Sequence, residues 1–362
     1  DDRTYGRVVS ADARVRLTDQ TVFTSQIVGT FADASFRDEI FGGSRQRRGN
    51  GLGYFGKLER RSRHTLTAVT WQGLSPDYRA DLGFNRRVNN NSVTVATTYN
   101  SEPRPDASLI SWSLTNVALA QWDWQGRADF VYVYPQAQLN FRRQTYVRAL
   151  AFRDYERIFE EEFGVKRGEG RTGAFAGDSE RSTSWEGVIV QAGTAPAESI
   201  SVSATVSRSW DVFDYDFGAG ARYPRVSPAA LLDPRAPLDP GPATATAVGG
   251  EITWRPIDAL RTSLNVSHNT LVRNDNGRTA YEAALVSART TYQLTRFAFI
   301  RLRTDWDSAA AVVRGQYLLG WNPNPGTAVY VGYNDAAGTE PRYVRSQRTL
   351  FVKMSFLFRK TL

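Results

Sequence analysis

Residues that could do chemistry are scarce in this chain. It contains no cysteine, and its two histidines are His64 and His268. Disulfides and thiolate metal sites are therefore excluded, and little imidazole chemistry is available. No serine near either histidine lies in the strand–turn–helix motif that exposes a catalytic nucleophile. Most nucleophilic and zinc-dependent enzyme classes thus lack their usual residues.

Two polar stretches remain as candidate sites, and the first is Asn274-Asp275-Asn276-Gly277. Clustered oxygen ligands suit a hard cation, so this stretch resembles the start of a calcium loop. Glu282 comes too early to be the distal bidentate acid of the twelve-position pattern. The alternative is a polar connection between strands, with Gly277 at positive φ. We favour the connection and expect no metal.

The second stretch is acidic: Glu160, Glu161 and Glu162 precede Asp178 and Glu180. Paired carboxylates can act as acid and base in glycoside hydrolysis, but only at a defined separation that sequence does not give. The alternative is a solvated acidic loop, which we favour. The expectation is therefore a protein that is not an enzyme and carries no cofactor.

Arginine supplies most of the positive charge. The chain has 45 Lys and Arg against 37 Asp and Glu, a formal net charge of +8. A nucleic-acid surface would gather these cations on one face. Here they are spread singly along strand-like segments and interleaved with acids. We expect no nucleic-acid partner.

A period of two dominates the hydrophobic pattern. Successive strand side chains point to opposite faces, so alternation indicates a ribbon with one dry and one wet side. The segment 200–211 places Ile200, Val202, Ala204, Val206 and Trp210 on the dry side, against serines and Thr205. Near the C-terminus the dry side carries Leu350, Val352, Met354, Phe356 and Phe358.

About seventeen such segments follow one another, and many run ten residues or more. Ordinary strands have about 5–6 residues, whereas a strand that crosses a bilayer at a tilt needs about 9–11. No apolar run approaches the ~18 residues of a transmembrane helix. The sequence therefore predicts an all-β fold: a large antiparallel transmembrane β-barrel of about 16–18 strands, formed by residues 1–362.

The connections alternate in length, as in barrels of the bacterial outer membrane. That is the predicted location, with the lipid bilayer and the barrel-assembly machinery as partners. Short turns are expected at 18–20, 62–63, 142–143, 255–258, 292–295 and 323–326, and long loops at 33–51, 74–90, 158–183, 213–242 and 335–343.

The strand count is odd, whereas single-chain bacterial barrels are usually even. If the long loops face outward, the first segment enters from the outer side. We therefore expect further strands, or an upstream periplasmic domain, before Asp1.

Several stretches resemble an uncharacterised family of bacterial outer-membrane proteins that joins an N-terminal carbohydrate-binding-like domain (family nine type) to a C-terminal barrel domain of unknown function. The similarity implies a barrel whose upstream domain lies outside this sequence, and it brings no catalytic residues. The matching stretches are ADARVRL (11–17), GLSPDYRADLGFNRR (73–87), WNPNPGT (321–327), GYN (332–334) and RTLFVKMSFLFR (348–359).

The two faces of the ribbons predict two sets of residues. We expect the membrane-facing set to be Ile200, Val202, Val206, Trp210, Leu350, Val352, Met354, Phe356 and Phe358. We expect the lumen-lining set to be Arg14, Arg16, Arg301, Arg303, Arg314, Lys353 and Arg359. Aromatic girdles at the two interfaces are predicted from Trp71, Tyr99, Trp112, Trp122, Trp124, Tyr132, Tyr134, Trp210, Trp254, Trp306, Tyr317 and Trp321.

Three functions remain open at this stage. The first is a pore or transport-related barrel with a mildly anion-favouring, porin-like interior. The second is a non-conducting barrel that anchors a protein partner in an outer-membrane complex. The third is a soluble all-β protein that binds or processes carbohydrate. The strand lengths favour a membrane barrel over the third.

Overall fold

A computed structural model describes residues 5–37, 44–79, 88–164, 173–324, 326–339 and 344–357, although side chains are described only outside 34–37 and 44–47. It contains seventeen strands, one short α-helix, α1 (Pro228–Leu232), and one 3-10 turn, η1 (Glu160–Glu162). The strands are β1 (Tyr5–Thr18), β2 (Thr21–Arg37), β3 (Ser44–Arg61), β4 (Thr65–Leu74), β5 (Asn90–Asn100), β6 (Leu109–Trp122), β7 (Ala128–Phe141), β8 (Tyr146–Phe159), β9 (Glu180–Ala197), β10 (Ile200–Asp214), β11 (Gly241–Ile257), β12 (Leu260–Arg273), β13 (Thr279–Gln293), β14 (Ala298–Asp307), β15 (Val312–Asn324), β16 (Thr327–Gly338) and β17 (Val344–Phe356).

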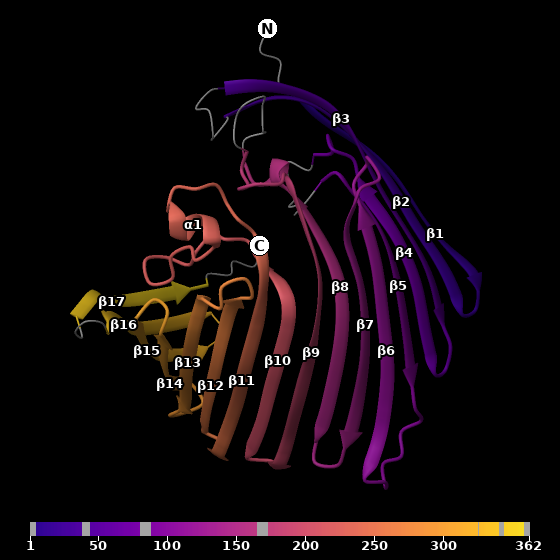
Figure 1. Ribbon diagram of the computed structural model, residues 1–362. Coiled ribbons are helices and arrows are strands. Elements are labelled where there is room, and N and C mark those ends of the chain that lie inside the picture. The colour runs from indigo at the N-terminus through magenta and orange to yellow at the C-terminus, as the bar shows by residue number, and fades with distance from the viewer. Residues whose placement is uncertain are drawn as a thin grey trace, which may run out of the picture.

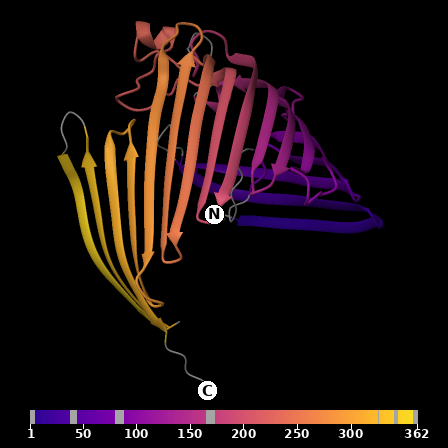
Figure 2. The same cartoon turned by 90° about the horizontal axis from the view of Figure 1, so that it is seen from below.

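Each strand pairs antiparallel with the next one along the chain, so the sheet is one continuous meander. The ribbon curves strongly from β1 round to β17 (Figures 1 and 2). The predicted all-β antiparallel fold is confirmed, including strands of ten to eighteen residues. No described helix is both long and apolar enough to cross a membrane.

The first and last strands are the free edges of the described sheet. Within the described pairings β1 meets only β2, and β17 meets only β16. Both are exposed on both faces: adjacent Val8 and Val9 are 65% and 66% exposed, and Leu350 is 72% exposed. Sixteen antiparallel pairings separate the two edges, so β1 and β17 run in the same direction. A direct seam between them would be parallel.

Burial is inverted relative to a water-soluble protein. Large apolar side chains such as Val206, Ile252 and Met354 are 49%, 43% and 62% exposed, whereas Asp154 and Arg273 are each 1% exposed. A soluble domain buries the first kind and exposes the second. Exposed valine and leucine on the outside of a sheet are stable where hydrocarbon replaces water.

Strand register joins the apolar positions into one continuous surface, here called the apolar face. In an antiparallel pair, directly opposed residues share a face. Ile200 opposes Trp254, and the same rung continues across the sheet to Leu350. Its members are Ile200, Trp254, Thr262, Thr290, Leu302, Tyr317, Tyr333 and Leu350. The membrane-facing residues predicted on β10 and those described on β17 thus lie on one face.

The opposite surface, here called the polar face, carries hydroxyl, amide and charged groups. One of its rungs links Ser203 to Arg314 and illustrates this composition. Its members are Ser203, Glu251, Asn265, Ser287, Asp305 and Arg314.

The three longest connections leave the sheet at one end, here called the loop end. They are 75–89, 160–179 and 215–240, and each joins an even-numbered strand to the next odd one. Figure 1 shows α1 and its loop at this end of the strands. The connections at the other end, the turn end, are mostly two to four residues long.

Two predicted loops are wrong. Residues 33–51 form mostly strand, since β2 extends to Arg37 and β3 begins at Ser44, with Asp33 paired to Arg48. The first residues of the predicted loop 335–343 likewise belong to β16, which ends at Gly338. Strand that extends beyond a bilayer is wet on both sides, so it loses the alternation that marks a strand in sequence.

The two faces of β10 offer a direct test of which one meets lipid. We expect Val206→Arg, on the apolar face, to lower the free energy of unfolding by about 2–4 kcal/mol, because a cation must enter hydrocarbon. Thr205→Arg, one residue away on the polar face, is the matched control and should have little effect. Urea unfolding in lipid vesicles measures both variants. Equal destabilisation by the two would contradict this assignment of faces.

Candidate functional site: the polar face and its loop cap

The described residues predicted to line a lumen all lie on the polar face. Arg14 opposes Thr24, in a rung that continues to Lys57, and Arg16 lies two residues further along the same face. On the other side of the sheet Arg303 opposes Arg289, with Arg301 two residues away. Arg314 opposes Asp305, and Lys353 opposes Tyr330. Arg359 and the predicted membrane-facing Phe358 lie outside the described residues.

Acids neutralise part of this positive charge. Arg303 Nε lies 2.7 Å from Asp305 Oδ2, and the hydroxyl of Ser287 donates to Asp305 Oδ1 at 2.6 Å. Near the other edge Lys57 Nζ lies 2.5 Å from Glu59. The face is therefore mixed in charge, with a local excess of arginine on β13 and β14.

A chain of aromatic rings crosses the polar face on β7, β8 and β9. Tyr132 and Tyr134 stack with centroids 4.2 Å apart, and Phe152 makes edge contacts with Tyr134 and Trp185. Tyr132 opposes Asp154, so Tyr132 and Tyr134, two residues apart on β7, lie on the polar face. The prediction that these two tyrosines belong to an interfacial girdle is wrong. The hydroxyl of Tyr134 is satisfied on the polar face because the carboxylate of Asp154 accepts its hydrogen bond.

Asp154 is the carboxylate at the centre of this aromatic chain. It is 1% exposed, and Tyr134 Oη donates to its Oδ2 at 3.1 Å. Its Oδ1 has no hydrogen-bond partner in the described structure, and neither has Nε1 of Trp185, the residue directly opposite on β9. A buried acceptor and a buried donor therefore lie unsatisfied on adjacent strands, an arrangement that costs roughly 1–3 kcal/mol for each group.

Two long connections join to form what we call the loop cap, described over residues 173–179 and 215–240. Phe175 and Leu238 form a parallel bridge, in which Ala176 N donates to Leu238 O at 2.7 Å and Leu238 N donates to Ala174 O at 2.9 Å. Phe175 also packs with Ile158 and Phe213 in a small hydrophobic core. The cap is thus a packed unit and not a pair of independent loops.

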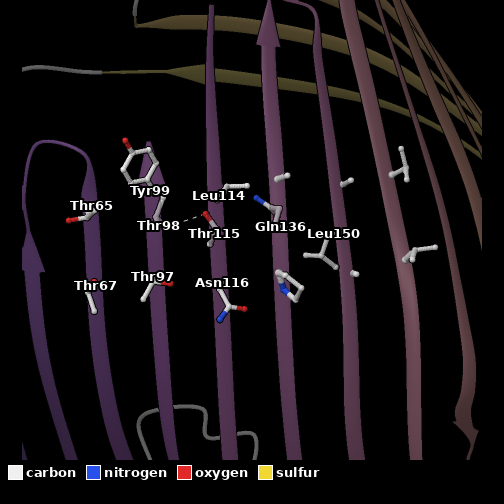
Figure 3. A pocket seen from close by; sticks show the side chains of 16 residues that line it. Thr65, Thr67, Thr97, Thr98, Tyr99, Leu114, Thr115, Asn116, Gln136 and Leu150 are labelled. Atoms are coloured by element: carbon white, nitrogen blue, oxygen red, sulfur yellow. Dashed lines mark hydrogen bonds between the residues drawn. The ribbon is translucent and has the colours of Figure 1, made fainter. Parts of the chain in front are cut away.

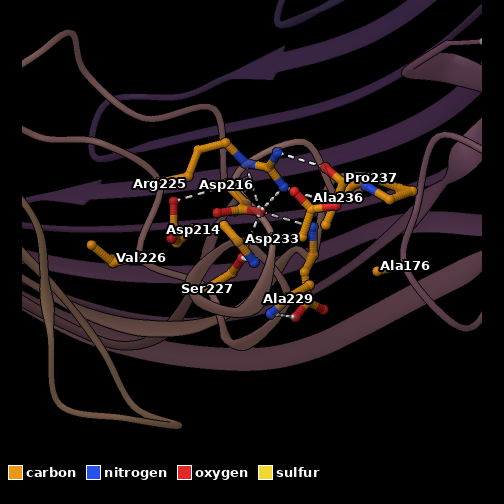
Figure 4. Close-up of polar contacts among 12 residues, drawn as sticks. Ala176, Asp214, Asp216, Arg225, Val226, Ser227, Ala229, Asp233, Ala236 and Pro237 are labelled. Atoms are coloured by element: carbon orange, nitrogen blue, oxygen red, sulfur yellow. Dashed lines mark hydrogen bonds and ion pairs between the residues drawn. The ribbon is translucent and has the colours of Figure 1, made fainter.

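A buried carboxylate organises the larger part of the cap (Figure 4). Asp216 Oδ2 accepts from Arg225 Nη2 at 2.6 Å, from Ser227 Oγ at 2.8 Å and from the backbone N of Asp239 at 3.0 Å. Ser227 also caps the N-terminus of α1, accepting from Ala230 N at 3.1 Å. Arg225 donates to the carbonyls of Ala236 and Pro237, which closes the loop on itself.

Arg273, at the end of β12, ties the cap to the sheet. Its guanidinium is 1% exposed and lies 3.0 Å from Asp214 and 2.6 Å from Asp275. It also donates to the carbonyl of Asp239 at 3.1 Å. A buried cation with two carboxylates and a carbonyl around it is well satisfied. Sequence analysis missed Arg273 because its partner Asp214 lies far away in the chain.

The candidate calcium stretch is part of this anchor. Both Asp275 oxygens accept from Arg273, and Asn276 Nδ2 donates to the carbonyl of Val226 in the cap at 2.8 Å. Asn274 Nδ2 donates to Asp211, and Gly277 has φ of +67°. The stretch is thus a polar connection that binds the cap. Among the described residues no group of three or more acidic or histidine side chains could hold a metal ion.

The cap reaches across much of the loop end of the sheet. Tyr215 Oη donates to Glu156 of β8 at 2.5 Å, and Arg222 Nη1 donates to the carbonyl of Ser308 after β14 at 2.6 Å. Between these contacts, Tyr223 packs edge-on against Tyr281 of β13. Glu156 lies on the polar face beside Asp154, so the cap contacts that face directly.

The acidic stretch is solvated as predicted at Glu161, Glu162, Asp178 and Glu180, which are exposed, but not at Glu160. Glu160, 5% exposed, accepts from Phe175 N at 3.2 Å, and Glu161 lies 2.7 Å from Arg127. Arg127 also binds Asp123 at 2.7 Å, which links the β6–β7 and β8–β9 connections. Burial by itself would raise the pKa of Asp123, but hydrogen bonds and charge from Arg127 outweigh it and hold that pKa below its usual value.

The two histidines lie apart from this site. His64 stacks on Tyr99 at the turn end and lies 3.2 Å from Glu102, while His268 lies 3.1 Å from Glu282 on the apolar side of β12. Each makes one acidic contact.

Comparison with known proteins supports the fold. No family model and no curated protein matches the chain. Among solved structures, the copper transporter OprC is 9% identical, with a TM-score of 0.52 over 97% of this chain and 65% of that one. The ferric-catecholate import receptor Fiu of E. coli K12 is 9% identical (TM-score 0.45, covering 92% and 63%), and the siderophore receptor PirA of Pseudomonas aeruginosa is 11% identical (TM-score 0.40, covering 98% and 70%).

The likeness to OprC supports the fold of a large antiparallel outer-membrane β-barrel for this chain. The chain spans slightly less than two thirds of the length of OprC and Fiu. Sequence identities of 9% to 11% support a shared fold and no shared function.

The cap's buried ionic core should control its local stability. Asp216→Asn keeps the shape but removes the charge that Arg225 faces, so we expect the free energy of opening for residues 215–240 to fall by about 3 kcal/mol. Hydrogen exchange of that segment measures the change. Asp233→Asn, an exposed acid in the same loop, should leave exchange nearly unchanged. Slow exchange retained in Asp216→Asn would contradict the assigned role of this carboxylate.

The Asp123–Arg127 pair should make the loop end sensitive to acid. Because the folded pKa of Asp123 is lowered, its stabilising contribution is complete above the usual value of about 3.9 and is lost as pH falls through the folded pKa. We expect exchange of residues 123–127 to quicken below about pH 4. Asp123→Asn should abolish this dependence, whereas Asp106→Asn at the turn end should preserve it. An unchanged pH profile in Asp123→Asn would show that another group is responsible.

Proposed function

We propose that this chain is part of a transport-related outer-membrane barrel, in which the polar face lines an aqueous path and the loop cap governs entry from the loop end. One observation carries this proposal: the sheet exposes its apolar face while a packed, ion-paired cap contacts its polar face. A sheet that only anchors a partner has no need for a cap on the face turned away from lipid.

The chemistry of the path follows from the charges along it. Four arginines lie opposite or next to one another on the polar face of β12 to β14, and among the described residues Asp305 is the one acid that forms an ion pair with this group. They are Arg261, Arg289, Arg301 and Arg303. Such a concentration of guanidinium groups favours anions over cations in a water-filled passage. The solutes we propose are therefore small and polar, with a mild preference for negative charge.

Conduction requires the sheet to close, because hydrocarbon cannot satisfy a free strand edge. β1 and β17 run in the same direction, so an odd number of further strands would complete an all-antiparallel barrel. We propose that an upstream segment supplies these strands, in line with the family resemblance of the sequence. The longer solved receptors are compatible with this proposal.

The alternative function is a non-conducting barrel that anchors a protein partner. The small core of Ile158, Phe175 and Phe213 favours this alternative, because a core makes the loop cap rigid. A rigid cap that never opens would block the path and prevent conduction. Conductance separates the two functions.

We expect the full-length protein, extracted from outer membranes, to form channels in planar bilayers with anion over cation selectivity. Reversal of Arg301 and Arg303 to Glu should shift the reversal potential towards cations by several-fold in permeability ratio, since each unit charge contributes about 1 kcal/mol near an ion in water. Arg143→Glu, an exposed residue at the turn end, is the control. Absence of conductance, even after the cap is loosened by Asp216→Asn, would favour the anchoring function.

A further inference from the structure

The apolar face is hollowed by a groove that crosses β4 to β9 (Figure 3). Its volume is about 590 Å³, within the ~300–1,000 Å³ range of small-molecule sites. Most of its lining belongs to two neighbouring rungs of the apolar face. These rungs contribute Thr65, Tyr99, Leu114, Ala137, Ala149 and Val190 in one row, and Thr67, Thr97, Asn116, Pro135, Ala151 and Val188 in the next.

Small side chains create the groove. Ala137 and Ala149 oppose each other between the larger Leu114 and Val190, so the surface drops in the middle of the row. In the next row Pro135 has no N–H to donate, and the pairing of β7 with β8 passes over it from Val133 to Gln136. Proline in the middle of a sheet is unusual, and it marks this point as an interruption of the ladder.

Two unpaired arginines border the groove at its loop-end side. Arg208 directly opposes Val188, a lining residue, and Arg153 lies two residues beyond Ala151 on the same face of β8. Arg208 has its guanidinium 5.6 Å from the ring centre of Trp210. Neither arginine forms a hydrogen bond or ion pair with another described residue.

One acid lies among these cations. Glu186 of β9 opposes both Arg153 and Trp210, on the same face. The local charge is therefore two positive groups against one negative group. A cation beside hydrocarbon is costly unless it reaches the interface or meets a counter-charge. The excess positive charge at the groove's border thus lacks a counter-ion within the protein.

We propose that the groove binds an acyl chain of one anionic lipid in the leaflet on the loop-end side, with Arg153 and Arg208 contacting the headgroup phosphate. An acyl chain suits a groove whose exposed lining is mostly carbon, on a face already assigned to hydrocarbon. The phosphate supplies the missing counter-charge in charge-assisted hydrogen bonds with guanidinium groups. A second protein chain would require a broad interface, typically above about 1,000 Å² in total. This inference depends on the apolar face meeting lipid, and not on conduction.

The test measures lipid selectivity directly. The full-length protein is reconstituted in phosphatidylcholine vesicles that contain spin-labelled phosphatidylglycerol or, separately, spin-labelled phosphatidylcholine, and the motionally restricted fraction is recorded. We expect phosphatidylglycerol to be preferred. Arg153→Gln and Arg208→Gln should each reduce that preference by up to about fivefold, the contribution of one cation near a membrane surface.

Filling the groove tests the acyl-chain part separately. Ala149→Leu should displace the restricted anionic lipid while leaving both arginines in place. Ala288→Leu, at an alanine that is also exposed on the apolar face, on β13, is the matched control and should leave selectivity unchanged. Channel conductance is expected to be unaffected in all these variants, so failure here is distinguishable from failure of the transport proposal.

Three results would overturn the inference. They are equal restriction of the two lipids by the unmodified protein, selectivity that persists in the Arg153→Gln/Arg208→Gln double variant, and loss of a dimer, instead of loss of lipid, in Ala149→Leu. The last result would assign the groove to a second copy of the chain. Urea unfolding in vesicles verifies that each variant is folded.

Discussion

The backbone hydrogen-bond ladder is the interaction on which the rest of this structure depends. In hydrocarbon, every N–H and C=O must find a partner within the protein, because water is absent. The meander meets this requirement locally: each strand satisfies the strand that follows it in the chain. The outer rows of backbone groups of β1 and β17 have no described partner, and the ladder between β7 and β8 is interrupted at Pro135. The described pairing of the sheet thus ends at these two strands.

The separation of the two faces follows from the same geometry. Strand pairing fixes the register. Within each strand, alternate residues then lie on the same surface of the sheet, from β1 to β17. Most Val and Leu side chains lie on the apolar face, where they meet no penalty in lipid, while most of the charged side chains, such as Arg303 and Asp305, lie on the polar face. Charged groups there can remain hydrated or pair with one another, as Arg303 and Asp305 do. A shift of one residue in any strand would exchange the two sets.

The loop cap obeys a different rule. It lies beyond the ladder, so it is held by a small apolar core and by buried ion pairs whose members come from separate connections. Asp216 holds the long loop together from within, while Arg273 fastens it to the end of β12. Each buried charge has a charged partner, which limits the cost of removing it from water. Asp154 differs, since its described hydrogen-bond partner is the hydroxyl of Tyr134 and not a cation. Its Oδ1 has no hydrogen-bond partner in the described structure, and buried unsatisfied polar atoms of this kind often mark functional sites.

The sequence alone determined the all-β class, the number of long strands and the composition of each face, because a period of two is a local property that every strand records independently. The strand ends around Asp33 and Arg48 were missed, because strand that extends beyond a bilayer meets water on both faces and loses the alternation that marks it in sequence. Only the tertiary structure placed Tyr132 and Tyr134 with Asp154, joined Arg273 to Asp214, and formed the groove between Ala137 and Ala149. These features depend on register and on contacts between distant segments, and neither is encoded in the pattern of a single strand. Only the tertiary structure shows that β1 and β17 are not paired with each other in the described sheet. Pairing of the first and last strands is the most non-local contact in a meander, so no single strand's pattern reveals it.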